Sequence, residues 1–344
     1  MIPPSYKAAV LVSPGKIEIH ERPTPALRPE EALIRVRCAG ICGTDLALYS
    51  GAYESSLPMV LGHEFAGEVL AVGDERDSSR VGDRVTAEIN NTCVSWNLSD
   101  PCPACRAGIS NHCSKRTVLG ISGADGAFAE LVKTPVRNLH ALPGHMPFEH
   151  GTFVEPLAAA IQTFEVAPIS PGDIVVVLGA GRLGVLVCKV AALKGARVVA
   201  VSRSVRKLQL AERFGAHVLI DASKADVPSE VMALTGGLGA DIVVEATGSP
   251  EGLNSAFELV RPRGTICVKS TPGSATSEFP LTRAVVDEIR IQGSRCGPLG
   301  KAIRLMTRHD MDMDALVSCE YPLNEIEAAL DAARTNFKVL VRIE

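Results

Sequence analysis

The stretch "DIVVVLGAGRLGVLVCKVAALKGARVVAVSR", residues 173–203, contains two apolar runs with a glycine-rich turn and a helical segment between them. The first run, residues 173–178, is short and almost wholly aliphatic, which is typical of a strand buried in a parallel sheet. The glycine-rich turn follows it directly, and the helical segment leads into the second apolar run. This order is a βαβ unit, and it predicts an α/β domain with a doubly wound parallel sheet.

The turn at residues 179–184, "GAGRLG", has the spacing G-x-G-x-x-G. Alone this motif is weak evidence, because an ordinary strand-to-helix turn can contain it, but here it follows a strand and opens a helix. Glycine lets the backbone approach a pyrophosphate, and the helix N-terminus supplies oriented N–H groups. We therefore expect a Rossmann dinucleotide-binding site. Its expected contacts are Gly179, Gly181, Arg182, Leu183 and Gly184.

The residues at the end of the second strand indicate which dinucleotide binds. A site for NAD commonly has an acidic residue about 20 residues past the glycine motif, where it bonds the ribose 2′-hydroxyl. This chain has Ser202 and Arg203 there, so no carboxylate repels a 2′-phosphate, and Arg203 can pair with one. The sequence therefore favours NADP(H) over NAD(H), with Ser202, Arg203 and Lys207 as contacts. The alternative is a solvated basic surface loop.

Two further segments, "GADIVVEATGS" and "GTICVKST", are typical of buried strands and extend the predicted site. Lys269 falls where the second of these strands should end near the nicotinamide. We expect it to bind the cofactor or an acidic group of the substrate, and a solvated surface lysine is the alternative. The further expected cofactor contacts are Thr247, Lys269, Ser270, Thr271 and Arg295.

Length, charge and composition limit the function classes. The chain has 344 residues, enough for about two domains of ~150 residues, and 46% of its residues are apolar. The net charge is −4 without a basic run, which argues against a nucleic-acid or anionic-membrane partner. No signal peptide is recognisable, and no apolar run reaches the ~20 residues of a membrane span. We expect a cytoplasmic protein whose ten cysteines are reduced and available to bind metal.

The pattern of apolar residues predicts two domains. The first third consists of short alternating runs separated by Pro and Gly, as in β-rich domains. The pattern changes to α/β after Pro156 and changes again at about Gly293, before the chain ends in the apolar strand "KVLVRI". We expect this tail to pack on the first domain. The predicted domains are residues 1–155 with 293–344, and residues 156–292.

The first domain carries candidate metal ligands on short, glycine-punctuated segments. Cys42 lies in "AGICGTD", and His63 and Glu64 lie in "GHE". Glu155, at the domain junction, offers a fourth ligand. Zinc binds cysteine sulfur, histidine nitrogen and carboxylate oxygen, and a catalytic zinc keeps one position open. The alternative is a buried cysteine beside a surface His-Glu pair, but the cluster as a whole predicts a catalytic zinc site.

Together these segments resemble the zinc-dependent medium-chain dehydrogenase/reductase family. The resemblance covers essentially the whole chain and rests on "AGICGTD", "GHEFAGEV", "GDRV", "DGAFAEL", "EPLAAA", "GAGRLG", "EATGS" and the C-terminal strand. It implies a GroES-like catalytic domain and a Rossmann domain, with the active site in the cleft between them. It also implies an enzyme that transfers a hydride between NADP(H) and a small secondary alcohol, polyol or sugar derivative, or the corresponding carbonyl.

The resemblance points to the polyol-dehydrogenase branch of the family. Glu155 is similar to that branch, because the ordinary alcohol dehydrogenases have cysteine at this position. "GSRCG" places Arg295 where the branch has an arginine close to the substrate and the nicotinamide. The family is usually dimeric or tetrameric, so we expect a homodimer or homotetramer that binds a small-molecule substrate.

The resemblance also implies a path for the proton. Thr44 would be the first proton acceptor, and Asp45 would orient the zinc ligand His63. Many relatives have a histidine three residues after the relay hydroxyl, which passes the proton to solvent. This chain has Ala47 at that position. A water or a carboxylate near the zinc would have to replace the missing histidine.

A second cysteine set consists of Cys93, Cys102, Cys105 and Cys113, with the spacing C-x8-C-x2-C-x7-C. The family's structural-zinc lobe, here at about residues 90–115, usually begins with a two-residue gap. The first gap is therefore longer here, and its extra residues can form a loop at little cost in free energy. We expect a four-thiolate zinc site. The alternative is a lobe without metal in which Cys93 is free.

Two other functions are compatible with parts of the pattern. A zinc-free enone or quinone reductase has the same fold but lacks the Cys-His-Glu set. A non-enzymatic NADPH-binding redox sensor needs the nucleotide site but has no use for an open zinc site. The combination of both sites therefore favours a zinc-dependent alcohol dehydrogenase or carbonyl reductase.

Overall fold

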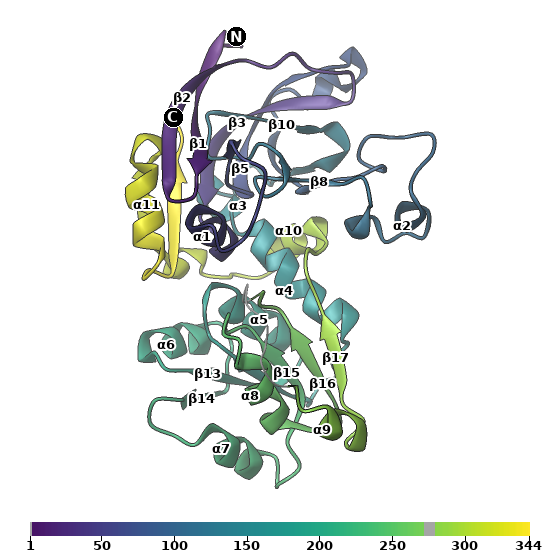
Figure 1. The fold of residues 1–344 in the computed structure, drawn as a ribbon, viewed down its shortest axis with the longest axis vertical. Coiled ribbons are helices and arrows are strands. Elements are labelled where there is room, and N and C mark those ends of the chain that lie inside the picture. Colours follow the sequence, from purple (N-terminus) through teal and green to yellow (C-terminus); the bar gives the residue numbers. More distant parts are fainter. Residues whose placement is uncertain (1, 272–278) are drawn as a thin grey trace. The chain divides into compact units, whose positions relative to one another are not determined.

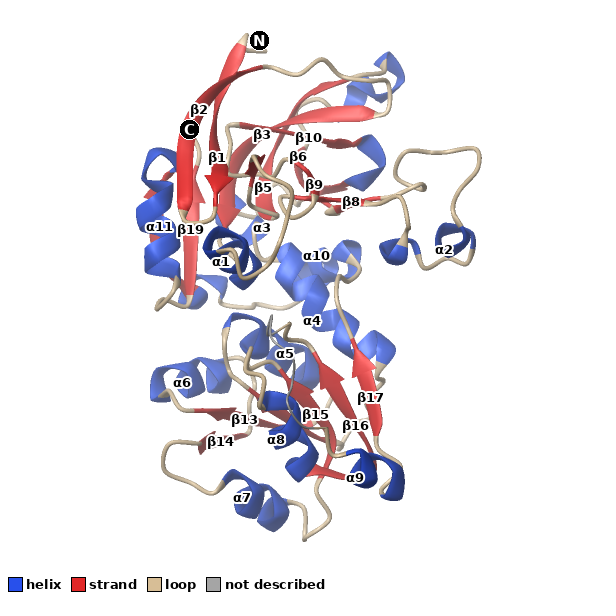
Figure 2. Cartoon of the chain, in the orientation of Figure 1, coloured by secondary structure: helices blue, strands red, loops and turns tan. Residues whose placement is uncertain are grey.

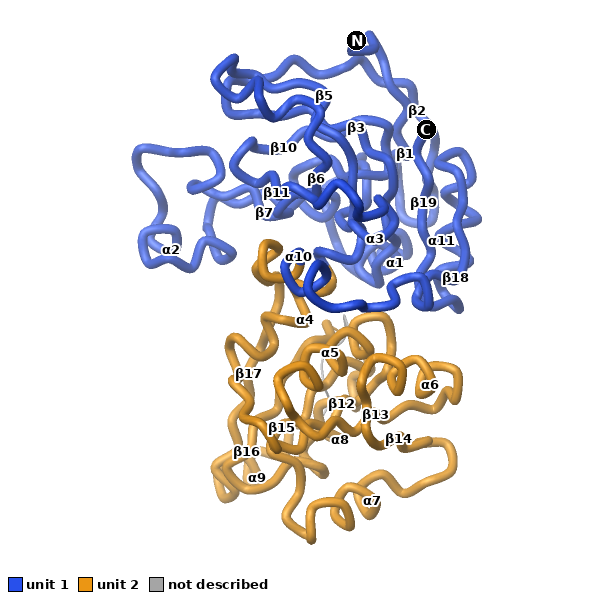
Figure 3. The backbone as a smooth tube through the Cα atoms, turned by 180° about the vertical axis from the view of Figure 1, so that it is seen from behind, with its two compact units in different colours: residues 1–155, 303–344 blue, residues 156–302 orange. Residues whose placement is uncertain are grey.

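Contacts within the chain divide the protein into two units (Figure 3). This computed structural model describes residues 2–271 and 279–344. The first unit contains residues 1–155 and 303–344, and the second contains residues 156–302. The sequence places the return to the first unit at residue 293, but the structure places it at Ile303. The intervening segment stays with the second unit, because the Lys269 ammonium bonds backbone carbonyls near its start.

A parallel sheet forms the second unit (Figures 1 and 2). Its strands are β12 (Ile174–Leu178), β13 (Arg197–Ser202), β14 (Val218–Asp221), β15 (Ala240–Glu245), β16 (Val260–Val268) and β17 (Arg290–Gly293). Their order, β14-β13-β12-β15-β16-β17, reverses direction between β12 and β15. Such a point is where ligands bind in doubly wound sheets, at the carboxyl ends of the strands. The predicted fold class is confirmed.

Helices connect these strands and pack against the sheet. They are α5 (Arg182–Leu193), α6 (Val205–Arg213), α7 (Val227–Leu234), α8 (Gly252–Leu259) and α9 (Leu281–Val286), and the unit boundaries fall within α4 (Val154–Val166) and α10 (Leu299–Arg308). Val176, Val243 and Phe257 belong to the fully buried core between strands and helices. In the part of the chain that the structure describes, no helix is long and apolar enough to cross a membrane.

The glycine-rich turn joins β12 to α5 and depends on its glycines. Gly179 has a φ of +94°, and a Cβ there would lie 2.7 Å from the carbonyl oxygen of Ala246. A Cβ on Gly184 would lie 2.0 Å from the carbonyl oxygen of Gly179. Side chains at these positions would therefore collide with backbone. This close approach fixes the N-terminus of α5 at the carboxyl edge of the sheet.

The first unit is rich in β structure, as predicted. Its strands are β1 (Ser5–Ser13), β2 (Lys16–Pro23), β3 (Glu31–Gly40), β4 (Met59–Val60), β5 (Glu64–Val72), β6 (Arg84–Ala87), β7 (Asn90–Asn91), β8 (Thr117–Leu119), β9 (Gly123–Ala124), β10 (Leu131–Pro135), β11 (Leu139–Ala141), β18 (Val317–Pro322) and β19 (Lys338–Arg342). Its helices are α1 (Gly43–Ser50), α2 (Pro103–Arg106), α3 (Phe148–Gly151) and α11 (Ile326–Ala333), with 3-10 helices η1 (Glu75–Arg80), η2 (Ser110–His112), η3 (Val136–Asn138), η4 (Met313–Leu316) and η5 (Leu323–Glu325).

The C-terminal strand completes the largest sheet of the first unit, whose order is β11-β6-β5-β3-β19-β18, with β10 also paired to β3. β19 lies antiparallel to β3, with Leu340 opposite Gly40. On the other side of β3, Gly40 is opposite Glu64 at the start of β5. The sheet thus brings residues from near the C-terminus beside the predicted metal ligands.

Candidate metal centres and nucleotide site

The structure brings Cys42, His63 and Glu64 together. One ligand atom from each residue lies within 4.8 Å of the others. Cys42 is the residue that precedes α1, and its extended backbone turns the chain into that helix. Glu64 begins β5, and His63 comes directly before it. The end of β3, the start of α1 and the start of β5 therefore position three different donor types at one point.

Asp45 organises this group from behind. Its side chain is completely buried and accepts hydrogen bonds from the backbone N–H of Cys42 at 2.8 Å and of Gly62 at 3.2 Å. One carboxylate oxygen lies 3.4 Å from Nδ1 of His63, near enough for electrostatic attraction although the geometry is not that of a hydrogen bond. Asp45 thus ties the segments of both ligands together and lies on the Nδ1 side of the imidazole.

The charges of the group favour a thiolate. Burial alone would raise the pKa of Cys42, but the charge and hydrogen bond of His63 outweigh it and lower that pKa. Burial alone would lower the pKa of His63, but Asp45 and Cys42 raise it well above its usual value. Each of the two side chains therefore favours the charged form of the other. A dication in this place would substitute for the imidazolium proton.

Lys338, at the start of β19, forms an ion pair with Glu64. Both side chains are 3% exposed, and the ammonium lies 5.5 Å from the centre of the Phe153 ring. Burial lowers the pKa of Lys338 to about 8, although Cys42 and Asp45 act in the opposite direction. Charged side chains are almost never this buried without a partner, so the pair is a specific feature of the site.

Gly40 makes room for this pair. A Cβ at Gly40 would lie 2.6 Å from both Cε and Nζ of Lys338 and 3.0 Å from Glu64. The lysine side chain therefore crosses β3 at its one residue without a side chain. Lys338 is not among the residues predicted from the sequence, although a lysine at the start of the otherwise apolar strand "KVLVRI" is a signal of a buried charge.

Two further residues predicted for this site, Thr44 and Glu155, differ in whether they lie beside the three ligands. Oγ1 of Thr44 is 3.9 Å from Sγ of Cys42, in the first turn of α1. Glu155 lies in the first turn of α4 and is not a member of the three-residue group. The structure therefore places Thr44 beside the ligands but does not bring Glu155 into the same set.

The donors suit zinc. Thiolate, imidazole and carboxylate are its usual protein ligands, and three protein ligands with a fourth position open characterise catalytic sites. The imidazole Nδ1 of His63 is buried without a hydrogen-bond partner among the residues described, so Asp45 and a metal at the other nitrogen would complete its environment. The observed residues therefore fit the metal that the sequence predicts.

The second group consists of four buried cysteines in one lobe, Cys93, Cys102, Cys105 and Cys113. Their sulfur atoms lie within 4.8 Å of one another, with Sγ of Cys113 3.5 Å from that of Cys93 and 3.7 Å from that of Cys102. The longer first gap has not removed Cys93 from the set. All four thiols are thus close enough together to bind one metal ion.

The thiols of this lobe differ in proton affinity. Backbone hydrogen bonds from Cys105 and Ser114 lower the pKa of Cys102 to about 5. Burial, followed by hydrogen bonds to the neighbouring thiols, raises the pKa of Cys105 to about 12. Four mutually close thiols cannot all ionise without a counter-charge, and a bound dication would supply one.

A cavity of about 710 Å³ lies at the carboxyl ends of the second unit's strands. It is lined by Gly179, Ser202, Arg203, Lys207 and Thr247, all predicted cofactor contacts. Glu251 and Glu258 also line it, so it is not purely basic. The end of β13 itself carries no carboxylate, in agreement with the sequence. Gly181 and Arg182 lie at the adjoining start of α5.

The remaining predicted cofactor contacts lie at the ends of neighbouring strands. Lys269, Ser270 and Thr271 follow β16, and Arg295 follows β17. Lys269 does not extend into solvent, because its ammonium bonds oxygen atoms of Ala159, Ser294 and Arg295. Ser270 donates its hydroxyl proton to Glu245. These two side chains therefore have protein partners already.

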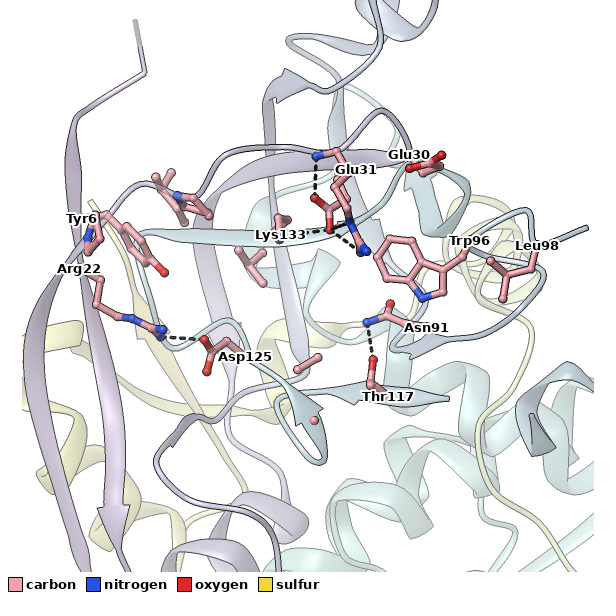
Figure 4. Close-up of a pocket in the computed structure, with 17 residues that line it drawn as sticks. Tyr6, Arg22, Glu30, Glu31, Asn91, Trp96, Leu98, Thr117, Asp125 and Lys133 are labelled. Carbon is pink, nitrogen blue, oxygen red and sulfur yellow. Dashed lines mark hydrogen bonds and ion pairs between the residues drawn. The ribbon is translucent and has the colours of Figure 1, made fainter. Parts of the chain in front are cut away.

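Another cavity, of about 720 Å³, lies in the first unit (Figure 4). Its wall contains Trp96, over which the Arg28 guanidinium lies at 4.6 Å. Arg28 bonds Glu31. Figure 4 shows Lys133 bonded to Glu31 at one end, and Arg22 bonded to Asp125 at the other. Among the described residues, none of the candidate metal ligands lines this cavity. Its charged groups thus neutralise each other, and it is separate from the predicted chemistry.

Comparisons with known proteins show the family of the chain. Residues 28–144 match the alcohol dehydrogenase GroES-like domain, and residues 183–309 match the zinc-binding dehydrogenase family. The chain is 30% identical to a sorbitol dehydrogenase of Halalkalibacterium halodurans over 332 residues, or 95% of each protein.

Two solved structures are similar over nearly their whole length. A zinc-binding dehydrogenase from Sinorhizobium meliloti 1021 bound to NADP has a TM-score of 0.89 and 32% identity, with 98% of this chain and 99% of that chain covered. An alcohol dehydrogenase from E. coli CFT073 complexed with NADH has a TM-score of 0.90 and 26% identity, with 99% and 100% covered. The chain therefore belongs to the zinc-dependent medium-chain dehydrogenase/reductase family and is an oxidoreductase of the alcohol dehydrogenase type.

Proposed function

We propose that the protein transfers a hydride between NADP(H) and a small secondary alcohol, polyol or sugar derivative, or its carbonyl. The observation that carries this proposal is the group of Cys42, His63 and Glu64 with the buried Asp45 behind it. A zinc-free reductase has no need of such a group. The sorbitol dehydrogenase among the relatives supports a polyol as the substrate class.

Cys42 and His63 would hold the catalytic zinc, with a carboxylate from Glu64 or Glu155 as the third ligand. When bound, the metal supplies a Lewis acid that polarises the substrate oxygen. Glu64 is already paired with Lys338, so its charge is largely compensated. Glu155, which the resemblance to the polyol branch implies as a ligand, is therefore the alternative third ligand to Glu64.

The chain's own residues would handle the proton. A bound nicotinamide would supply the hydride acceptor for oxidation of an alcohol. Oγ1 of Thr44 would accept the substrate hydroxyl proton as its own proton moves on. Asp45 holds the Cys42 and His63 segments in place through its two backbone hydrogen bonds. Because Ala47 cannot relay a proton, a water next to Thr44 would carry it to solvent.

The cofactor would bind along the carboxyl edge of the second unit's sheet. Its pyrophosphate would lie on the N–H groups at the start of α5, where the glycine turn permits close approach. Arg203 and Lys207 would bind the 2′-phosphate of NADP(H), with Ser202 at the ribose. Similar structures hold either NADP or NADH, so this preference comes from the residues themselves.

The four cysteines of the lobe would hold a second zinc ion that stabilises the fold. All four ligand positions would be filled by protein, which leaves none for a substrate. Two zinc ions per chain are therefore expected, one for catalysis and one for structure.

A second copy of the chain would bind at the edge of the parallel sheet. Among the described strands, β17 is paired on one side only, so its other backbone groups can pair with an identical strand. Next to it, α9 exposes Val285 and Val286, which are 68% and 73% exposed. A homodimer would cover both features, and light scattering after size exclusion would measure its mass.

One experiment separates this function from its rivals. Purified protein is analysed for zinc and then assayed with NADPH and NADH against a panel of ketones, ketoses and enones. We expect zinc-dependent reduction of a ketose or small ketone, faster with NADPH. Reduction of enones without zinc would instead indicate a zinc-free type of reductase. NADPH binding without turnover on any carbonyl would indicate a sensor.

A further inference from the structure

A buried carboxylate lies at the carboxyl end of β15. Glu245 is 2% exposed and accepts hydrogen bonds from the backbone N–H and the hydroxyl of Thr247, at 2.8 Å and 2.6 Å. It also accepts the hydroxyl proton of Ser270 from the end of β16. A Cβ on Gly252 would lie 2.4 Å from this carboxylate, so the glycine that opens α8 leaves space for it. The surrounding chain is thus built around Glu245.

Lys269, the residue before Ser270, carries the opposite charge to Glu245. The Lys269 ammonium bonds the carbonyl oxygen of Ala159 in α4 at 2.9 Å, those of Ser294 and Arg295 at 3.2 Å and 3.3 Å, and the Ser294 hydroxyl at 3.2 Å. An ammonium has three N–H groups, and these four oxygen atoms take all of them. The same residue's backbone N–H bonds the carbonyl oxygen of Glu245 at 2.9 Å.

These contacts join three strand ends. Two consecutive residues after β16 bond different neighbours. Ser270 bonds Glu245 at the end of β15, and Lys269 bonds the segment that follows β17. A dinucleotide binds across the carboxyl ends of such a sheet, at the point where the strand order reverses, and the sequence places Lys269 near its nicotinamide. The two charged groups therefore lie under the predicted nicotinamide site, and both are occupied by protein atoms.

We propose that Glu245 and Lys269 are positioning residues for the nicotinamide nucleoside and do not contact it themselves. Thr247 and Ser270 both donate their hydroxyl protons to Glu245, and the Thr247 hydroxyl also accepts the backbone N–H of Ser249 at 3.0 Å. Each hydroxyl can therefore offer a ligand only an acceptor lone pair that remains free of these bonds. The group that they recognise must be a hydrogen-bond donor, which the ribose hydroxyls and the carboxamide NH2 of the nicotinamide nucleoside supply. Lys269 fixes the distance between this surface, α4 and the Arg295 segment. The inference rests on the proposed use of a nicotinamide cofactor.

The proposal is tested by comparing the binding of whole NADPH with the binding of its adenosine half. The variants are Lys269→Met, Glu245→Gln and Ser270→Ala. The matched controls are Lys194→Met, in the turn after α5, and Glu212→Gln, in α6, both at exposed positions in the same unit. Calorimetry measures their affinity for NADPH and for 2′-phosphoadenosine 5′-diphosphate, which lacks the nicotinamide nucleoside.

For Lys269→Met and Glu245→Gln we expect NADPH to bind about 10-fold more weakly or worse, because unmade buried hydrogen bonds displace the strand ends. The adenosine fragment should bind within about 2-fold of wild type. The KM for NADPH should rise while the KM for the carbonyl substrate stays unchanged. Lys269→Arg, which keeps the charge and donors, should recover most of the affinity. Ser270→Ala should weaken NADPH binding by about 3-fold, and it tests the proposal even if Glu245→Gln does not fold.

Equal losses for NADPH and the fragment would mean that Lys269 binds a phosphate or supports the whole unit, and the proposal would be wrong. Unchanged NADPH affinity in both Lys269→Met and Ser270→Ala would overturn it as well. If the wild-type protein binds NADPH no more tightly than the adenosine fragment, the proposed cofactor is wrong and the inference fails with it.

Discussion

The two candidate metal groups are built in opposite ways. The lobe takes four identical donors, Cys93, Cys102, Cys105 and Cys113, from one short segment. The other group takes three different donors from segments that meet only when β3, α1 and β5 assemble. Around the lobe cysteines the partners are mainly backbone N–H groups and each other, whereas Asp45 and Lys338 provide charged partners at the other group.

This difference indicates which group does chemistry. A metal ion bound by four thiolates has no position left for a substrate. The four cysteines also come from one short segment, so they can be brought together without the rest of the fold. A mixed site with three ligands keeps a position open, and its charged neighbours control the charge of the ligands. We expect the lobe to determine stability and the mixed group to determine activity.

The most direct way to break this comparison is to remove one ligand from each group. Cys42→Ser should lower kcat/KM by about 10³-fold or more, because the Lewis acid contributes several kcal/mol, and should leave the melting temperature nearly unchanged. Cys102→Ser should lower the melting temperature and leave kcat of the folded protein within about 5-fold. Steady-state kinetics and thermal unfolding measure both. A reversed pattern, with activity lost at Cys102, would refute the division of roles.

Breaking the buried ion pair should have the next largest effect. Lys338→Met leaves Glu64 buried without its cation, and we expect the free energy of unfolding to fall by about 3–5 kcal/mol. The double variant Glu64→Gln/Lys338→Met should lose much less than the sum of the single variants, because no unpaired charge remains. Urea unfolding measures all three proteins. Additive losses would show that the two side chains do not depend on each other.

Cofactor selection should be independent of both metal groups. Arg203→Ala should weaken NADPH binding by about 1.5–3 kcal/mol, the contribution of a hydrogen bond to a charged group, and leave NADH binding nearly unchanged. Fluorescence titration of both cofactors measures this, with zinc content as the control. Equal affinity of the wild-type protein for NADPH and NADH would contradict the assignment.

Glu155 sharpens the account of the mixed group, because it lies outside the three residues that the structure brings together. If it binds or supports the metal, Glu155→Ala should cost about 10–100-fold in metal affinity or activity and leave NADPH affinity unchanged. Glu165→Ala, in the same helix, is the matched control. Full zinc content and full turnover in Glu155→Ala would leave Glu64 as the carboxylate ligand.

The sequence predicted the parts of the protein that local patterns determine. Local patterns were enough to predict the glycine turn before α5 and the two groups of donor side chains that the structure brings together. The ion pair of Lys338 could not be predicted in this way, because its partner Glu64 is distant in sequence and only the pairing of β19 with β3 brings them together. Lys269 was predicted to bind a ligand because it follows a strand, and this stays a prediction. No residue pattern reveals that its ammonium also bonds the carbonyl oxygens of Ala159 and Ser294. The change of residue pattern near Gly293 predicted the return to the first unit there, but the structure has it at Ile303. The bonds of Lys269 to Ser294 and Arg295, which hold that segment in the second unit, could not be predicted from the pattern.

The zinc content of three proteins tests the central claim most directly. Elemental analysis of the freshly purified wild-type protein, Cys42→Ser and Cys102→Ser gives the number of zinc ions that each group holds. The account predicts about two zinc ions per wild-type chain and about one in each variant, with activity only where the mixed group is intact. A wild-type protein with a single zinc ion, which persists in Cys102→Ser and disappears in Cys42→Ser, would show that the four-cysteine lobe holds no metal and would contradict the two-site account.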